Sequence, residues 1–207
     1  MLRSALVVLA LTASASADVD WSRGLVTAPG IGLADRQAPN PAVARGTSRR
    51  RAEEAAKQAL SAALPALPLA TGGTLADKLG DPTIKARIDQ AIAGAIGVAA
   101  DPETDGSWRV TMAVPIEAVR QALLGPRALP AAGDDGPPVI VVEGATSAPA
   151  VGTTVGGASA ATLWVKDVPA WAKSAPRVKA KASKAGAIDL DRGKATDATL
   201  FVIVTKT

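Results

Sequence analysis

The chain contains neither cysteine nor histidine among its 207 residues. Without a thiol or an imidazole it cannot build a Ser-His-Asp or Cys-His nucleophilic centre, nor a zinc site that depends on those ligands. It also cannot form a disulfide, so burial of apolar surface must hold the fold together. These absences remove the commonest routes to catalysis, and we expect no enzyme activity, no cofactor and no metal site.

Serine and carboxylate chemistry find little support in the motifs. Neither S-x-x-K nor G-x-S-x-G occurs, so the usual settings of a serine nucleophile are missing. Carboxylates can act as acid and base, and the candidate carboxylates form three groups: Asp101, Glu103 and Asp105; Asp134 and Asp135; and Asp189, Asp191 and Asp197. The first and third groups are spaced like calcium-binding loops, but neither combines glycine at position six with glutamate at position twelve. We interpret all three groups as solvated turns.

Aromatic residues are also scarce, with four tryptophans, one phenylalanine and no tyrosine. The core must therefore consist of alanine, valine, leucine and isoleucine, with tryptophan as an occasional large anchor. Because the four tryptophans are spread along the sequence, we interpret them as core anchors rather than as platforms that stack on sugars. The composition is otherwise typical of a globular protein.

The first 17 residues have the three parts of a secretory signal peptide. Arg3 supplies the positive segment, residues 5–11 the apolar segment, and residues 15–17 (Ala-Ser-Ala) a small-residue cleavage site. The apolar run is too short to span a bilayer. We therefore expect an exported mature chain that starts near Asp18, with no transmembrane span and, lacking cysteine, no lipid anchor. Its net charge, +3 after loss of Arg3 from a total of +4, does not indicate a nucleic-acid partner.

The longest helical pattern runs from Asn40 to Leu64. Asn40 can cap the helix N-terminus, and Pro41 suits the first turn. Apolar residues recur at helical spacing, namely Ala52, Ala56, Ala59, Leu60, Ala63 and Leu64. A face made mostly of alanine lets a sheet approach closely, so we expect this helix to lie on a sheet.

Shorter patterns predict further elements around this helix: a strand over residues 19–28, a second helix capped by Asp81, a strand over 107–114, and a short helix opened by Pro115. Asp105 and Gly106 predict a hairpin turn. Gly30 and Gly32 form a G-x-G after the first strand, but no helix follows directly. We interpret them as part of a turn and not as a phosphate-binding loop.

The C-terminal part has a different character. Residues 126–137, rich in proline, glycine and aspartate, are interpreted as a linker. Strands are predicted over residues 139–142, 160–165 and 199–205, the last buried on both faces because it is continuously apolar. The prediction is thus an α+β fold. A long alanine-rich helix and a second helix pack on a small, mainly antiparallel sheet over residues 18–125, and a smaller strand-rich domain follows over 138–207.

Basic residues cluster near the C-terminus. Between Lys166 and Thr207 there are nine lysines and arginines and four aspartates, an excess of five positive charges. Five of the basic residues form a possible anion-binding surface: Lys173, Arg177, Lys179, Lys181 and Lys184. Such a surface can meet anionic lipid headgroups or acidic envelope polymers. The alternative is a solvated edge strand, where lysine prevents pairing with other chains.

The order of these elements resembles a known family. Its marks are Trp21-x-x-Gly24, the basic helix ARGTSRRRAEEAAKQAL, the hairpin and strand DGSWRVTM, and near the C-terminus ATLFVIV. Over residues 19–125 the chain resembles the LPP-type outer-membrane lipoproteins and the N-terminal domain of the flagellar H-ring assembly protein T. The resemblance implies an α+β domain of the bacterial envelope that assembles with copies or partners and has no catalytic residues. This chain lacks the lipidated cysteine of the lipoproteins.

We therefore expect a non-enzymatic envelope protein, located in the periplasm or at the outer membrane, that acts by interaction or assembly. Its expected partner is an envelope protein or a second copy of the chain. The alternative is a binding module for anionic polymers or lipid headgroups that uses the basic C-terminal residues.

The electrostatic alternative predicts a strong dependence on salt. Binding to an anionic surface should weaken between low and moderate ionic strength, because salt screens exposed charges. Combined reversal of charge at Lys179, Lys181 and Lys184 should abolish it. Cosedimentation with anionic lipid vesicles at two salt concentrations measures both effects. Association through apolar patches would instead persist in salt and give a fixed oligomer.

Overall fold

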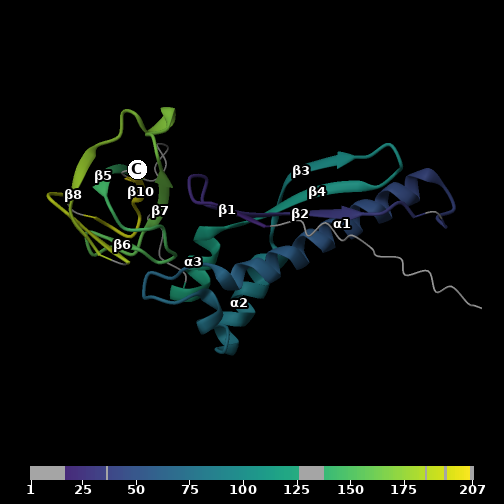
Figure 1. Cartoon of the computed structure of the whole chain (residues 1–207), viewed down its shortest axis with the longest axis horizontal. Helices are drawn as coiled ribbons and strands as arrows, with labels where there is room; N and C mark the ends of the chain where they lie inside the picture. Colours follow the sequence, from purple (N-terminus) through teal and green to yellow (C-terminus); the bar gives the residue numbers. More distant parts are fainter. Residues whose placement is uncertain (1–16, 36, 126–137, 185, 194, 206–207) are drawn as a thin grey trace, which may run out of the picture.

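The strands of the protein form two sheets. The computed structural model describes residues 17–35, 37–125, 138–184, 186–193 and 195–205. The sheet orders are β1-β2-β4-β3 and β6-β9-β8-β5-β10-β7, and the sheets follow one another along the long axis of the molecule (Figure 1). The predicted α+β class is confirmed. The predicted linker, and all but the last residue of the predicted signal peptide, lie outside the described residues.

The N-terminal part forms the four-stranded sheet and three α-helices. Its elements are β1 (Asp18–Asp20), β2 (Leu25–Gly32), α1 (Pro41–Ala63), η1 (Leu64–Ala66), η2 (Leu75–Lys78), α2 (Pro82–Ala93), β3 (Ile96–Pro102), β4 (Trp108–Pro115) and α3 (Ile116–Leu124). All pairs in this sheet are antiparallel. The single strand predicted over residues 19–28 is instead a hairpin, because the chain reverses between β1 and β2.

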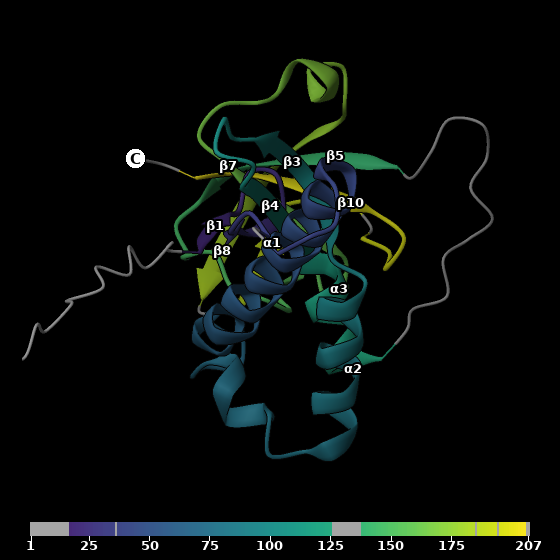
Figure 2. The ribbon, with the colours of Figure 1, turned by 90° about the vertical axis from the view of Figure 1, so that its right-hand side faces the viewer.

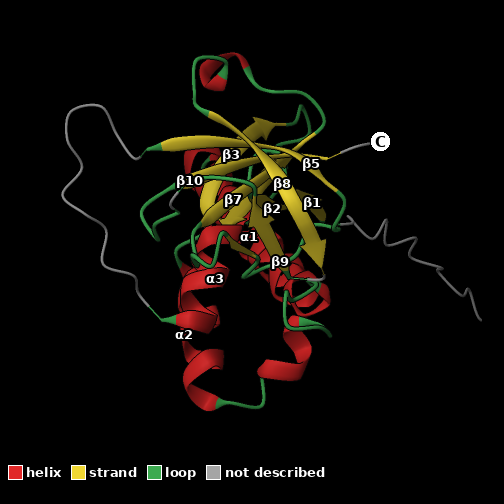
Figure 3. Cartoon of the chain, turned by 90° about the vertical axis from the view of Figure 1, so that its left-hand side faces the viewer, coloured by secondary structure: helices red, strands yellow, loops and turns green. Residues whose placement is uncertain are grey.

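The structure confirms the predicted N-terminal cap and buried face of helix α1. The Asn40 side chain caps it by accepting a hydrogen bond from the Val43 N–H at 3.0 Å. Its predicted face is fully buried at Ala52, Ala56 and Leu60, as is Leu64 just beyond its end, while Ala59 and Ala63 are half-buried. Figure 3 shows the helices gathered on one side of the strands.

The turn predicted at Gly30 and Gly32 is wrong, since both lie in strand β2. They face α1, where a β-carbon on Gly30 would overlap backbone atoms of Ala52 and Ala56. A β-carbon on Gly32 would lie 2.6 Å from the Ala52 nitrogen and would overlap the Ser48 carbonyl oxygen. The glycines therefore let a helix backbone touch a strand backbone, a role that glycine in strands often serves.

Helix α2 and strand β3 are the most exposed elements of this part. Asp81 caps α2 as predicted, accepting from the Thr83 N–H at 2.7 Å, but only Ile88 of the helix is buried. α2 packs against α3 (Figure 2). All seven residues of β3, the last strand in the sheet order, are exposed. No helix in the described ranges combines the length and apolar character needed to cross a membrane.

The second sheet contains β5 (Val139–Ala145), β6 (Thr154–Val155), β7 (Ala161–Val165), β8 (Arg177–Lys184), β9 (Ala187–Leu190) and β10 (Leu200–Thr205), with the 3-10 turn η3 (Ala170–Ala172). β10 lies between β5 and β7 and is parallel to both. Phe201, Val202 and Ile203 are fully buried, so the prediction of a strand buried on both faces is confirmed. The carboxyl termini of β5, β10 and β7 therefore lie at the same end of the sheet.

Contacts join the two sheets at several points. The backbone N–H of Trp164 on β7 donates to the Trp21 carbonyl in the β1–β2 turn at 3.0 Å. The Ala70 N–H donates to the Val151 carbonyl at 2.9 Å. Arg120 of α3, only 5% exposed, pairs with Glu117 at 2.7 Å and donates to the Ser159 hydroxyl at 3.2 Å. The sheets thus share a hydrogen-bonded junction.

The contact between β2 and α1 predicts a large loss of stability for Gly32→Ala. The added methyl group must push the helix away from the strand, and overpacking of this kind costs about 3 kcal/mol. Urea unfolding of the mature protein measures the change.

Gly46→Ala is the matched control, because the same methyl group meets no atom within 4 Å on the exposed side of α1. It should raise stability by about 0.5–1 kcal/mol, since alanine is the better helix former. Equal effects of the two substitutions would contradict the close contact.

Candidate binding pocket

The five residues of the predicted anion-binding surface do not lie on a free edge. Four of them, Arg177, Lys179, Lys181 and Lys184, are exposed on β8, which hydrogen-bonds to β5 on one side and β9 on the other. The predicted edge strand is therefore wrong. The register shift at Lys181 resets the alternation, so that Lys184 also points outward. Lys173 lies apart, in the loop after η3.

Acidic side chains interrupt this basic group. Arg177 pairs with Glu143 at 2.9 Å, and Glu143 lies opposite Lys179 in the sheet. Asp191 accepts a hydrogen bond from the Lys179 N–H at 3.2 Å, and Asp189 is exposed on the neighbouring strand. Four cations on β8 thus face three carboxylates, so the surface has a much smaller net charge than the sequence alone indicates.

The predicted carboxylate groups serve mainly in turns. Asp105 accepts hydrogen bonds from the backbone and the hydroxyl of Ser107 in the β3–β4 hairpin. Asp197 accepts from the Ser159 N–H at 2.9 Å. Asp134 and Asp135 lie outside the described residues. Within the described ranges, acidic side chains nowhere gather in a group of three that could hold a metal ion.

A cavity lies at the carboxyl ends of the three parallel strands. It has a volume of about 880 Å³, and its lining includes the last residue of each strand: Ala145 of β5, Val165 of β7 and Thr205 of β10. The loops after β5 and β7 supply most of the remaining wall, and the β1–β2 turn from the other sheet closes it. The volume is typical of ligand pockets.

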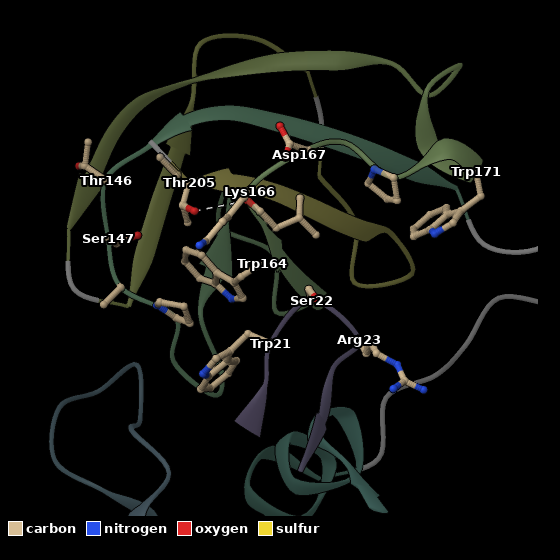
Figure 4. A pocket seen from close by; sticks show the side chains of 15 residues that line it. Trp21, Ser22, Arg23, Thr146, Ser147, Trp164, Lys166, Asp167, Trp171 and Thr205 are labelled. Carbon is tan, nitrogen blue, oxygen red and sulfur yellow. Dashed lines mark hydrogen bonds between the residues drawn. The ribbon is translucent and has the colours of Figure 1, made fainter. Parts of the chain in front are cut away.

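Three of the four tryptophans line this pocket (Figure 4). Trp164 of β7 is 4% exposed, Trp21 of the β1–β2 turn is half-buried, and Trp171 of η3 is 58% exposed. Ala172, the last residue of η3, is buried in a cluster with Val141, Val165 and Val202 and anchors the turn that presents Trp171. The interpretation of the tryptophans as dispersed core anchors is therefore incomplete. Only the fourth, Trp108, lies elsewhere, with the Arg49 guanidinium 5.5 Å from its ring centre.

Polar groups complete the pocket lining. The indole N–H of Trp164 and the hydroxyl of Ser147 are both buried and have no hydrogen-bond partner in the described part of the chain, as is also true of the indole N–H of Trp108 outside the pocket. Buried polar groups are normally paired, so a ligand group that reached either atom would supply its missing hydrogen-bond partner. Arg23, Lys166 and Asp167 supply the charges around the pocket.

The β1–β2 turn is held by the carboxylate of Asp20. One of its oxygens accepts from the Ser22 hydroxyl at 2.6 Å and from the N–H groups of Ser22 and Arg23 at 3.0 Å. The Ser22 hydroxyl does most to lower the pKa of Asp20 below its ordinary value; the backbone hydrogen bonds and the Arg23 charge act in the same direction, against partial burial. The ionised carboxylate therefore fixes the turn that carries Trp21.

Comparisons with known proteins add no relative: no protein-family model matches the chain, and no curated protein matches it. The geometry and chemistry of the pocket therefore carry the functional interpretation. Sequence reasoning missed this site because its walls come from residues about 20, 145, 165 and 205 along the chain. One signal was available, since Trp164 and Trp171 flank the end of a predicted strand.

The lowered pKa of Asp20 predicts a pH-dependent contribution to stability. Its ionised form favours the folded state at pH values above the unfolded pKa of about 3.9, and this stabilisation is lost as pH falls through the lower folded pKa. Asp20→Asn keeps an acceptor oxygen but removes the charge. Thermal unfolding should show the variant less stable than the wild type at pH 7, with the difference shrinking below pH 4.

Asp18→Asn is the control, because Asp18 is exposed on the same strand. The difference in its unfolding temperature between pH 7 and pH 3 should be near that of the wild type. A gap between wild type and Asp20→Asn that stays constant with pH would show that the carboxylate charge does not hold the turn.

Proposed function

We propose that the protein is an exported, non-enzymatic protein of the bacterial envelope that acts by interaction, and that the tryptophan-lined pocket is its recognition site. The observation that carries this proposal is the gathering of three of four tryptophans at one pocket. Tryptophan offers a large, rigid contact area that can pack and hydrogen-bond at once. Export is supported by the predicted signal peptide, and an interaction role by the resemblance to envelope proteins.

The ionisable groups of the pocket favour recognition over catalysis. The described lining contains one carboxylate, Asp167, and two cations, Arg23 and Lys166, all of them exposed. Hydrolysis of a glycosidic bond normally uses two carboxyl groups that flank the bond. These features support binding without turnover.

The pocket is preferred to the basic surface of β8 because of its composition. On β8 the carboxylates of Glu143, Asp189 and Asp191 offset most of the positive charge, and exposed ion pairs contribute little binding energy. The pocket instead offers aromatic surface and unpaired hydrogen-bonding atoms.

Loss of Trp171 should weaken association with the envelope. We expect the mature protein to cosediment with isolated Gram-negative cell envelopes, and Trp171→Ala to reduce the bound fraction at least about tenfold, as expected for a central aromatic contact. Because Trp171 is 58% exposed, its removal should leave the unfolding temperature unchanged.

Leu33→Ala is the matched control, because Leu33 is a more exposed apolar residue away from the pocket, with 70% of its surface accessible. It should bind like the wild type. Retention of envelope binding by Trp171→Ala, or chemical change of an envelope component during incubation with the pure protein, would overturn the proposed function.

A further inference from the structure

We propose that the pocket binds a neutral saccharide. This inference rests on the proposed function, because it names the chemical class of the ligand for the same pocket. Four observations support it: the arrangement of the indoles, the unpaired buried atoms, the alcohols of the lining and the balance of charge.

The three indoles present apolar surface at different depths. Trp164 forms the buried floor, Trp21 stands in the wall formed by the β1–β2 turn, and Trp171 projects from η3 (Figure 4). The C–H groups on one face of a sugar ring carry partial positive charge, and the face of an indole is negative. Sugar rings therefore stack on indoles, and an exposed indole such as Trp171 is available for such contact.

The unpaired atoms of the pocket need both a donor and an acceptor from the ligand. The Trp164 indole N–H can only donate, whereas the Ser147 hydroxyl can donate and accept. The carboxylate of Asp167 can only accept. Ser22 and Thr146 add further hydroxyl groups to the lining. Sugar hydroxyls donate and accept at closely spaced positions, so a saccharide offers partners to donors and acceptors alike.

A proline-rich peptide, the other common ligand of tryptophan-lined sites, fits less well. Its backbone offers carbonyl acceptors for the indole N–H of Trp164, but a proline residue has no backbone N–H to donate. It therefore supplies few donors for Asp167 and for the hydroxyl oxygens around the pocket.

The charges favour a neutral ligand. Arg23 lies beside Asp20, whose pKa it helps to lower, and Lys166 is followed by Asp167, with both residues in the pocket lining. Two cations and one carboxylate leave the lining a net charge of +1, and Asp20 beside Arg23 offsets it, so little net charge remains to select an acidic sugar or an anionic polymer.

Titration calorimetry of the mature protein with two neutral trisaccharides, cellotriose and chitotriose, tests the proposal. We expect at least one to bind in the micromolar to millimolar range. Trp171→Ala should weaken binding at least tenfold, and Ser147→Ala by about threefold to tenfold, since each removes a direct contact. Leu33→Ala should bind like the wild type.

Indole N–H signals in a nitrogen-15 NMR spectrum give a second readout that needs no variant at the buried Trp164. A bound saccharide should shift the signals of the three pocket tryptophans and leave that of Trp108 in place. Assignment follows from the loss of single signals in Trp171→Phe and Trp108→Phe.

Two results would overturn the saccharide proposal. One is failure of both neutral trisaccharides to bind at about 10 mM, well above a millimolar dissociation constant. The other is tighter binding of trigalacturonate or of a ten-residue proline peptide than of either neutral trisaccharide. If Trp171→Ala still lost envelope binding, the proposed function would stand and only the ligand class would be wrong.

Discussion

The backbone contact between α1 and β2 is the constraint on which the rest of the structure depends. Gly30 and Gly32 bring the strand against Ser48, Ala52 and Ala56 with no side chain between the two backbones. Inside this contact the Ser48 hydroxyl donates to the Gly32 carbonyl at 2.6 Å, so burial leaves neither group unpaired. A chain with one phenylalanine and no tyrosine thus packs its first sheet by closeness of approach instead of by large side chains.

The same strand transmits this constraint to the pocket. β2 begins at Leu25, just after the turn that carries Trp21 into the pocket wall. α1 fixes β2, and Asp20 fixes the turn. The Trp21 carbonyl accepts a hydrogen bond from the backbone N–H of Trp164. A slip of β2 along α1 would therefore move Trp21 relative to Trp164. The geometry of a pocket at the end of one sheet depends on glycine packing in the other.

The sequence predicted what depends on near neighbours in the chain and failed where distant segments meet. Asn40 and Asp81 mark helix starts because caps act within three residues, and the apolar run of β10 marks a buried strand. Gly30 and Gly32 look like a turn until a helix about 20 residues away is placed on them. The pocket has the same difficulty, because Trp21 and Trp164 become neighbours only when two sheets meet. The sequence shows that the chain contains these tryptophans, but it does not show that they meet at one pocket.

The basic surface of β8 and the tryptophan-lined pocket differ in what they offer a binding partner. On β8, positive charge that is continuous in sequence is broken in space by Glu143, Asp189 and Asp191, and water screens what is left. In the pocket the effects add, because apolar indole surface and unpaired hydrogen-bonding atoms belong to the same lining. A single exposed indole such as Trp171 would need no explanation. It acquires one because two more indoles, those of Trp21 and Trp164, line the same cavity, and the N–H of the buried Trp164 indole is unpaired.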